Sequence, residues 1–134
     1  MVKPRALVVS HFPAPVYFNV ASLLSGAGYR VDMAIDVTAG LAWLRRHYYD
    51  IVIDVENPRT PSWQSCEWMR QLTEAPIIVI SPRADAEACV RTINAGADYF
   101  LRKSCGPLEL LARIRALRQR ARCPHSTPAP LAAA

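Results

Sequence analysis

Short apolar runs, rich in β-branched residues, alternate with segments of helical periodicity along most of the chain. The runs at 51–53 and 77–80 are apolar at every position, as is typical of strands in a parallel sheet that helices cover on both faces. Five strand–helix repeats are predicted, at 6–9, 15–25, 30–34, 37–47, 50–55, 63–71, 76–81, 85–94, 99–102 and 107–122. This order predicts an α/β fold, a doubly wound five-stranded parallel sheet in a three-layer sandwich.

Glycines and prolines lie where the predicted helices begin and end. Gly26 and Gly28 are placed to end the first helix, and Gly96 is placed to end the fourth. Pro15 and Pro107 fit the first turn of a helix, where a missing backbone N–H leaves no hydrogen bond unmade. These residues support the predicted order of elements.

Length and composition fit one domain. The chain has 134 residues, of which 51% are hydrophobic and 20% charged, so a disordered or multi-domain chain is excluded. We expect one domain over residues 1–122 and, where the periodicity stops, a linker or disordered tail over residues 123–134. The net charge of +5 is concentrated in residues 100–134, which hold seven of the 16 basic residues but one of the 11 acidic ones. We interpret this charge as a solvated helix face and expect no direct binding of nucleic acid.

The sequence shows no sign of a membrane span or an export signal. Its longest apolar runs are far shorter than the roughly 20 residues that a membrane-spanning helix needs. The cysteines lie far apart, without the Cys-x-x-Cys spacing of zinc sites, at Cys66, Cys89, Cys105 and Cys123. We therefore expect a cytoplasmic protein with free thiols and no membrane partner.

Polar residues follow the predicted strands at their carboxyl ends, where a doubly wound sheet places its functional site. They are Ser10 and His11 after the first strand, Asp54 in the third, Ser81 in the fourth and Lys103 after the fifth. No pair of nucleophile and general base is evident among them, so we expect no enzyme activity.

Five stretches of the sequence resemble, in the same order, the receiver domain of bacterial two-component response regulators. They are Val8-Val9, Tyr49 to Asp54 with Pro58, Pro76 to Ser81, Gly96 to Lys103, and Pro107 to Arg115. The last two look most like the receivers of OmpR-type transcription factors, in which a winged-helix DNA-binding domain follows the receiver. The resemblance covers residues 5–122 and implies the flavodoxin/CheY-like strand order 2-1-3-4-5.

In that family an Asp at the end of the third strand accepts a phosphoryl group from a histidine kinase, with Mg²⁺ held by this Asp and by two acids after the first strand. By resemblance Asp54 takes the acceptor position, although the spacing to Ser81 is one residue short and leaves Val55 as the other possible register. Ser81 and Lys103 match the residues that contact the phosphoryl group. Phe100 matches the aromatic residue that moves inward on activation.

The acidic pair is where this chain departs from the family. Ser10 and His11 stand in its place, and a hydroxyl and an imidazole do not replace carboxylates as ligands of Mg²⁺. We therefore expect Mg²⁺ binding to be weak or absent, with no metal or cofactor in the domain, and a histidine kinase is not the expected activator. We also expect a standing ion pair between Asp54 and Lys103, and we expect Glu56 to offer its carbonyl, as in the family, rather than its side chain.

The family's output surface consists of the fourth helix, the fifth strand and the fifth helix, and in OmpR-type members it forms a two-fold dimer through salt bridges. Asp98 and Arg120 match one acid–base pair of that dimer. By the same comparison Glu109 would face a cysteine and Arg113 would face Tyr99. The resemblance therefore implies a homodimer with fewer salt bridges across its interface.

These observations lead to one hypothesis and two alternatives. The hypothesis is an atypical receiver, or pseudo-receiver, that acts in bacterial signal transduction and transcription regulation independently of phosphorylation, with a DNA-binding domain beyond this chain. The first alternative is a functional phospho-acceptor that is phosphorylated on Asp54. The second is a sensor that binds a small ligand, or is oxidised at a cysteine, in the vacated pocket near His11, Trp63 and Cys105.

Overall fold

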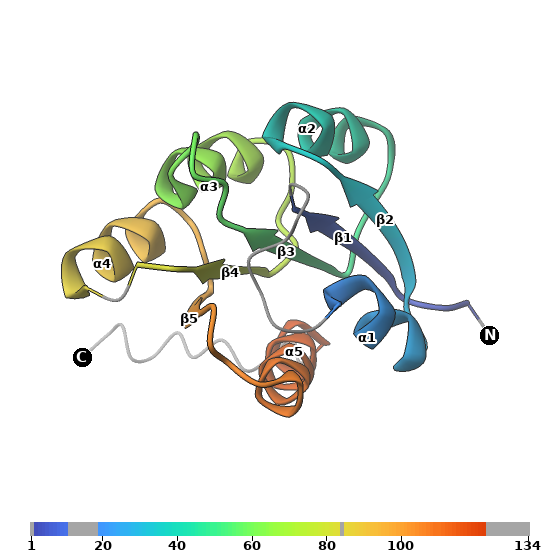
Figure 1. Ribbon diagram of the computed structural model, residues 1–134. Coiled ribbons are helices and arrows are strands. Elements are labelled where there is room, and N and C mark those ends of the chain that lie inside the picture. The colour runs from blue at the N-terminus through green and yellow to red at the C-terminus, as the bar shows by residue number, and fades with distance from the viewer. Residues whose placement is uncertain (1, 11–18, 84, 123–134) are drawn as a thin grey trace, which may run out of the picture.

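Five strands form one parallel sheet with helices packed on both faces (Figure 1). The computed structural model describes residues 2–10, 19–83 and 85–122. Its elements are β1 (Arg5–Val9), α1 (Val20–Gly26), β2 (Arg30–Ala34), α2 (Val37–Arg46), β3 (Ile51–Val55), α3 (Ser62–Arg70), β4 (Ile77–Ser81), α4 (Ala86–Asn94), β5 (Tyr99–Arg102) and α5 (Pro107–Arg122). The strand order is β2-β1-β3-β4-β5, which confirms the predicted topology.

The helices form two layers. Helices α1 and α5 cover one face of the sheet, and α2, α3 and α4 cover the other (Figure 1). All four strand pairs are parallel, so the carboxyl ends of the strands lie at one edge. The predicted three-layer sandwich is therefore confirmed.

Each face of the sheet has its own apolar core, because successive residues of a strand point to opposite faces. The core beneath α1 and α5 includes Ala6, Val8, Ile51, Ile53, Ile78, Ile80, Leu24, Leu110 and Ile114. The core beneath α2 and α3 includes Leu7, Val9, Val52, Ile77, Val79, Leu44, Cys66 and Met69. Burial of one such aliphatic side chain contributes about 1.5 to 3 kcal/mol, so the uninterrupted apolar strands are explained by contact on both sides.

The ends of the helices follow the local sequence, with one correction. Gly28 and Gly96, after α1 and α4, have φ angles of 96° and 123°, which suit glycine because it has no Cβ. The predicted start of the first helix near Pro15 differs from the structure, in which α1 begins at Val20. Asn19 is extended and its side chain accepts a hydrogen bond from the Ser22 N–H, so Asn19 is the N-cap. Residues 11–18 lie outside the described part of the chain.

The longest described helix is α5, with 16 residues. None of the helices in the described ranges combines the length and the apolar character that crossing a membrane would require. The predicted linker or tail at 123–134 lies outside the described residues, as does His11.

Candidate functional site

The carboxyl edge of the sheet brings together most of the polar residues that follow the predicted strands. Asp54 pairs with Val9 of β1 on one side and with Val79 of β4 on the other. Ser81 ends β4, and its carbonyl accepts a hydrogen bond of 3.0 Å from the Lys103 N–H after β5. The Ser10 N–H, after β1, donates to the carbonyl of Ala34 at the end of β2.

The Asp54 side chain is enclosed in the protein. It is 3% exposed, and its Oδ2 has no hydrogen-bond partner among the described residues. Burial raises the pKa of Asp54 to about 7; the nearby Ser62 hydroxyl offsets part of this increase, and the charge of Glu56 adds to it. A carboxyl group in this environment is a poorer nucleophile and metal ligand at neutral pH than an exposed one, because a large fraction is protonated.

The two candidate registers for the acceptor position have different surroundings. Val55 is 1% exposed and belongs to the core beneath α1 and α5, together with Ile80 and Leu101. Asp54 is adjacent in the strand and therefore points to the other face. Of the two registers, only the one that matches Asp54 to the acceptor places an ionisable side chain at the acceptor position.

The expected ion pair between Asp54 and Lys103 is not present. Among the described residues, the ion pairs are Arg5–Asp32, Arg70–Asp98, Arg83–Glu56 and Arg118–Asp50. Strand β4 separates β3 from β5, so the strands of the two residues lie about two strand spacings, or roughly 10 Å, apart, and Lys103 is three residues beyond Phe100, which is level with Asp54. The side chain of the half-buried Lys103 does not reach across this distance to Asp54. Burial favours the neutral form of the Asp54 carboxyl group, so little charge is available to attract the lysine.

The Glu56 side chain makes several polar contacts at this edge. It is 4% exposed and accepts a hydrogen bond from the Ser81 hydroxyl at Oε1. At Oε2 it accepts a bond of 2.9 Å from the Ser62 N–H and lies 3.3 Å from the Arg83 guanidinium. Two neighbouring segments thus supply donors that satisfy this buried carboxylate, a set of contacts that the resemblance did not predict.

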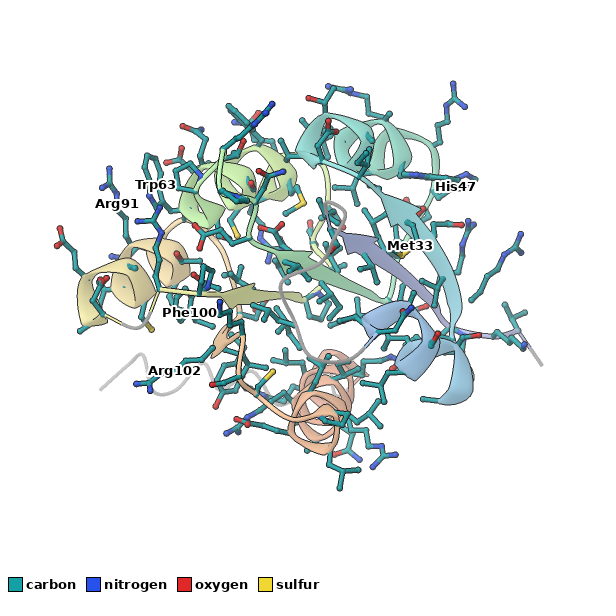
Figure 2. The ribbon with its side chains drawn as sticks, viewed as in Figure 1. Met33, His47, Trp63, Arg91, Phe100 and Arg102 are labelled. Carbon is teal, nitrogen blue, oxygen red and sulfur yellow. The ribbon has the colours of Figure 1, made fainter. Side chains whose placement is uncertain are left out.

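Phe100 lies on β5 (Figure 2), which β4 separates from the β3 strand that holds Asp54. Its ring is half-buried and packs against the core beneath α2 and α3. It pairs in the sheet with Val79, the residue that also pairs with Asp54. Phe100 therefore stands on the same strand ladder as Asp54, with β4 between them.

Among the described residues, the side chains at this edge do not fit a magnesium ion. Mg²⁺ is held by oxygen ligands in octahedral geometry, with carboxylates supplying the charge. Both Glu56 oxygens already accept hydrogen bonds, and Ser10 carries no charge. Within the described ranges no group of three His, Cys, Asp or Glu side chains is arranged to hold a metal ion.

The structure does not bring together the residues of the proposed sensor pocket. Trp63 lies on α3, and the Arg91 guanidinium of α4 covers its ring at 3.9 Å from the centroid (Figure 2). Cys105 belongs to the core on the opposite face of the sheet. Burial raises the pKa of the Cys105 thiol, which makes it less reactive rather than more. His11, the third member, lies outside the described residues.

Two of the four charged residues of the expected dimer face, Asp98 and Arg113, have partners within the chain. Asp98 accepts hydrogen bonds from Arg70, at 3.0 Å, and from the Ile77 N–H, at 2.8 Å. The Arg113 guanidinium stacks on the Tyr99 ring of the same chain, 4.4 Å from its centroid. Glu109 and Arg120 are exposed on α5. The contact of Arg113 with Tyr99 was expected between subunits but forms inside one.

Comparison with known proteins agrees with this architecture. Residues 14–115 match the family described as response regulator receiver domain. The chain is 37% identical over 98 residues to the response regulator ArlR of Staphylococcus aureus, which covers 72% of this chain and 45% of the relative. This chain therefore spans less than half the length of the curated relatives that it matches.

Solved structures show the same fold. A two-component response regulator from Clostridium difficile superposes with a TM-score of 0.80 at 18% identity, covering 90% of this chain and 100% of the other. A CheY-like receiver domain protein from Methanospirillum hungatei JF-1 superposes with a TM-score of 0.78 at 24% identity, covering 89% and 96%. The length of the family match and the identity to ArlR lead to one conclusion: this chain belongs to the response regulator receiver domain family.

Proposed function

We propose that this chain is an atypical receiver domain, without enzyme activity, whose signalling state does not depend on phosphorylation of Asp54. The observation that carries this proposal is the environment of Asp54. Its carboxyl group is buried, no cation pairs with it among the described residues, and its pKa is raised to about 7. Phosphoryl transfer to a carboxylate requires the opposite conditions, namely an ionised nucleophile and cations that neutralise the phosphoryl oxygens.

The chain departs from the family at the other positions that would supply those conditions. Ser10 stands where the family has an acid, and the Ser81 hydroxyl already donates a hydrogen bond to Glu56. Lys103 has no ion pair within the described residues. These features support weak or absent binding of Mg²⁺ and make a histidine kinase unnecessary as the activator.

The domain belongs, on this proposal, to a cytoplasmic regulator of bacterial transcription. The relative named response regulator ArlR is more than twice as long as the matched segment, which supports a DNA-binding domain beyond this chain. The receiver itself acts through protein contacts, as a homodimer that uses α4, β5 and α5. Exposed apolar side chains on α4, at Val90 and Ile93, support a role for this surface in contacts.

A functional phospho-acceptor is the second candidate. It is favoured by one observation, the position of Asp54, Ser81 and Lys103 at the same edge of the sheet. In that case the contacts of Glu56 would open to admit the phosphoryl group, and the buried Asp54 would become accessible.

Labelling with a small phosphodonor separates the two candidates. The protein is incubated with acetyl phosphate and Mg²⁺, quenched in acid, and its intact mass is compared with that of an Asp54→Asn variant. A receiver known to be phosphorylated is labelled in parallel, so that the donor is shown to be active. We expect no phosphoryl adduct on this chain. An adduct that is lost in Asp54→Asn would overturn the proposal and establish the phospho-acceptor.

A further inference from the structure

The carboxylate of Glu56 connects three segments of the chain at the carboxyl edge of the sheet. Glu56 lies in the loop after β3. Its carboxylate accepts hydrogen bonds from the Ser62 N–H at the start of α3 and from the Ser81 hydroxyl at the end of β4. The guanidinium of Arg83, in the loop between β4 and α4, pairs with it. A buried anion with a hydroxyl, an N–H and a guanidinium as donors is fully engaged, which is why its burial is tolerated.

These donors are of the kinds that a phosphoryl group would use. Phosphoryl oxygens accept hydrogen bonds from hydroxyl and backbone N–H groups and pair with guanidinium groups. Ser81 is the residue that matches the phosphoryl contact of the family, and in this chain its hydroxyl already donates to Glu56. Glu56 is two residues beyond Asp54, and its side chain reaches Ser81 from the loop that follows β3.

We propose that Glu56 is a resident anion that holds Ser81, and with it Arg83 in the segment after β4, in one fixed arrangement. This proposal rests on the proposed function, because it explains how a receiver can keep a single state without phosphorylation. Glu56 is a positioning residue: it acts on the output surface through Ser81 and Arg83.

The path from Glu56 to α4 is short. The Ser81 hydroxyl oxygen accepts a hydrogen bond of 3.0 Å from the Arg83 N–H. The hydroxyl that donates to Glu56 therefore also binds the backbone after β4. Asp85, two residues later, is the N-cap of α4, and its side chain accepts a hydrogen bond from the Ala88 N–H. Ser81 and Arg83 lie four and two residues before this N-cap, so a change in their arrangement is expected to reach the start of α4.

The test compares local opening of this connection in matched variants. Glu56→Gln keeps the size of the side chain but removes its charge, and Glu74→Gln makes the same change at an exposed residue in the loop before β4. Hydrogen–deuterium exchange is measured for peptides over Arg83 and the first turn of α4, at a pH where both variants are folded. We expect exchange there to rise roughly tenfold in Glu56→Gln, the size expected for loss of a charge-assisted hydrogen bond, and to stay unchanged in Glu74→Gln.

A rescue experiment distinguishes an anion requirement from ordinary packing. In Glu56→Ala the space of the carboxylate is open, and sodium formate supplies a small carboxylate in solution. We expect formate to slow exchange at Arg83 and the start of α4 again, whereas sodium chloride of equal ionic strength does not. An equal effect of the two salts would show that a carboxylate bound in the place of Glu56 is not what Ser81 requires, and the proposal would be overturned.

The outcomes separate this proposal from the proposed function. If exchange in Glu56→Gln equals that in Glu74→Gln, the resident-anion proposal fails, while the absence of a phosphoryl adduct on the wild-type chain would leave the proposed function standing. If the wild-type chain is labelled on Asp54, the proposed function fails and the role of Glu56 fails with it. Should Glu56→Gln not fold, Ser81→Ala removes the same contact from the other side. Because this variant also removes the acceptor of the Arg83 N–H, protection is read in the first turn of α4, and unchanged protection there would overturn the proposal.

Discussion

Arg70 Nη2 lies 3.0 Å from Oδ2 of Asp98 in the same chain, so this acid of the proposed dimer face already has a basic partner. The Arg70 guanidinium also donates to the carbonyls of Gly96, Thr73 and Ala75. Asp98 in turn accepts the N–H of Ile77 at the start of β4. The pair therefore joins the end of α3 to the segments that lead into β4 and β5.

Loss of the Arg70 guanidinium is expected to destabilise the domain. Arg70→Met keeps most of the aliphatic part of the side chain but leaves several partly buried carbonyls without a donor, so we expect a loss of about 2 kcal/mol in the free energy of unfolding. Arg70→Lys should lose less, since one ammonium group can still reach a carbonyl. Urea denaturation measures both, with Arg115→Met on the exposed surface of α5 as the control. Equal stability of the Arg70→Met and Arg115→Met variants would contradict this role.

The homodimer, if it forms as proposed, should depend little on the pair of Asp98 and Arg120. Exposed ion pairs contribute about 0 to 1 kcal/mol, and Asp98 is already bound to Arg70. We expect Arg120→Glu to raise the dimer Kd by less than about fivefold.

Apolar contact on α4 should matter more to this dimer than charge. Val90 is 57% exposed, and Val90→Asp should raise the Kd by more than about tenfold because it places a charge in the contact. Ile35→Asp, an exposed apolar residue after β2, is the matched control. Sedimentation velocity over a concentration series measures all three variants. A dimer abolished by Arg120→Glu but kept in Val90→Asp would contradict apolar association.

Most of the fold could be predicted from the sequence, because a strand that is buried on both faces is apolar at nearly every position. The run Ile77–Ser81 is apolar until its last residue, and the structure buries all of it. The start of α1 could not be placed in the same way. Pro15 fits the first turn of a helix, and only the structure shows that the Asn19 side chain accepts a hydrogen bond from the Ser22 N–H and so caps α1.

The placement of Asp54 and Ser81 at one edge of the sheet could be predicted, because both lie at the carboxyl ends of neighbouring parallel strands. Their contacts could not. The direction of the Glu56 side chain could not, because its partner Ser81 is 25 residues away in the sequence and meets it only through the pairing of β3 with β4. The missing pair of Asp54 and Lys103 has a similar reason, since the cost of burying a charge depends on surroundings that the sequence does not display.

Substitution of the glycines should separate backbone strain from lack of space. Gly96→Ala forces a Cβ to within 3.1 Å of the Arg70 side chain at a φ of 123°, and we expect a loss of about 2 to 3 kcal/mol. Gly28→Ala has a similar φ but nothing within 4 Å of the new Cβ, so a loss of about 1 kcal/mol is expected. Gly106→Ala has open space and no positive φ and should stay within about 0.5 kcal/mol of wild type. Thermal or urea unfolding would contradict this order if the three variants were equally stable.

The thiols provide a test of the redox alternative. Burial raises the pKa of both Cys66 and Cys105, whereas Cys89 is half-buried on α4. In a pulse of iodoacetamide on the native protein, we expect Cys89 to be alkylated at least about tenfold faster than either buried thiol. Peptide mass spectrometry gives the three rates, and a sample in denaturant provides the reference in which they become similar. Fast alkylation of native Cys105 would revive cysteine oxidation as a signal.

Stability should depend on pH through Asp54. Its pKa is about 7 in the folded protein and 3.8 in an exposed group, so between these values the folded state binds a proton that the unfolded state lacks. The stabilisation is complete below about pH 4 and is lost as the pH rises through 7. Relative to Asp54→Asn, which does not titrate, the wild-type free energy of unfolding should fall by about 2 to 3 kcal/mol between pH 5 and pH 8. Urea titrations of both proteins at four pH values measure this difference, and parallel curves would mean that Asp54 ionises as an ordinary carboxyl group.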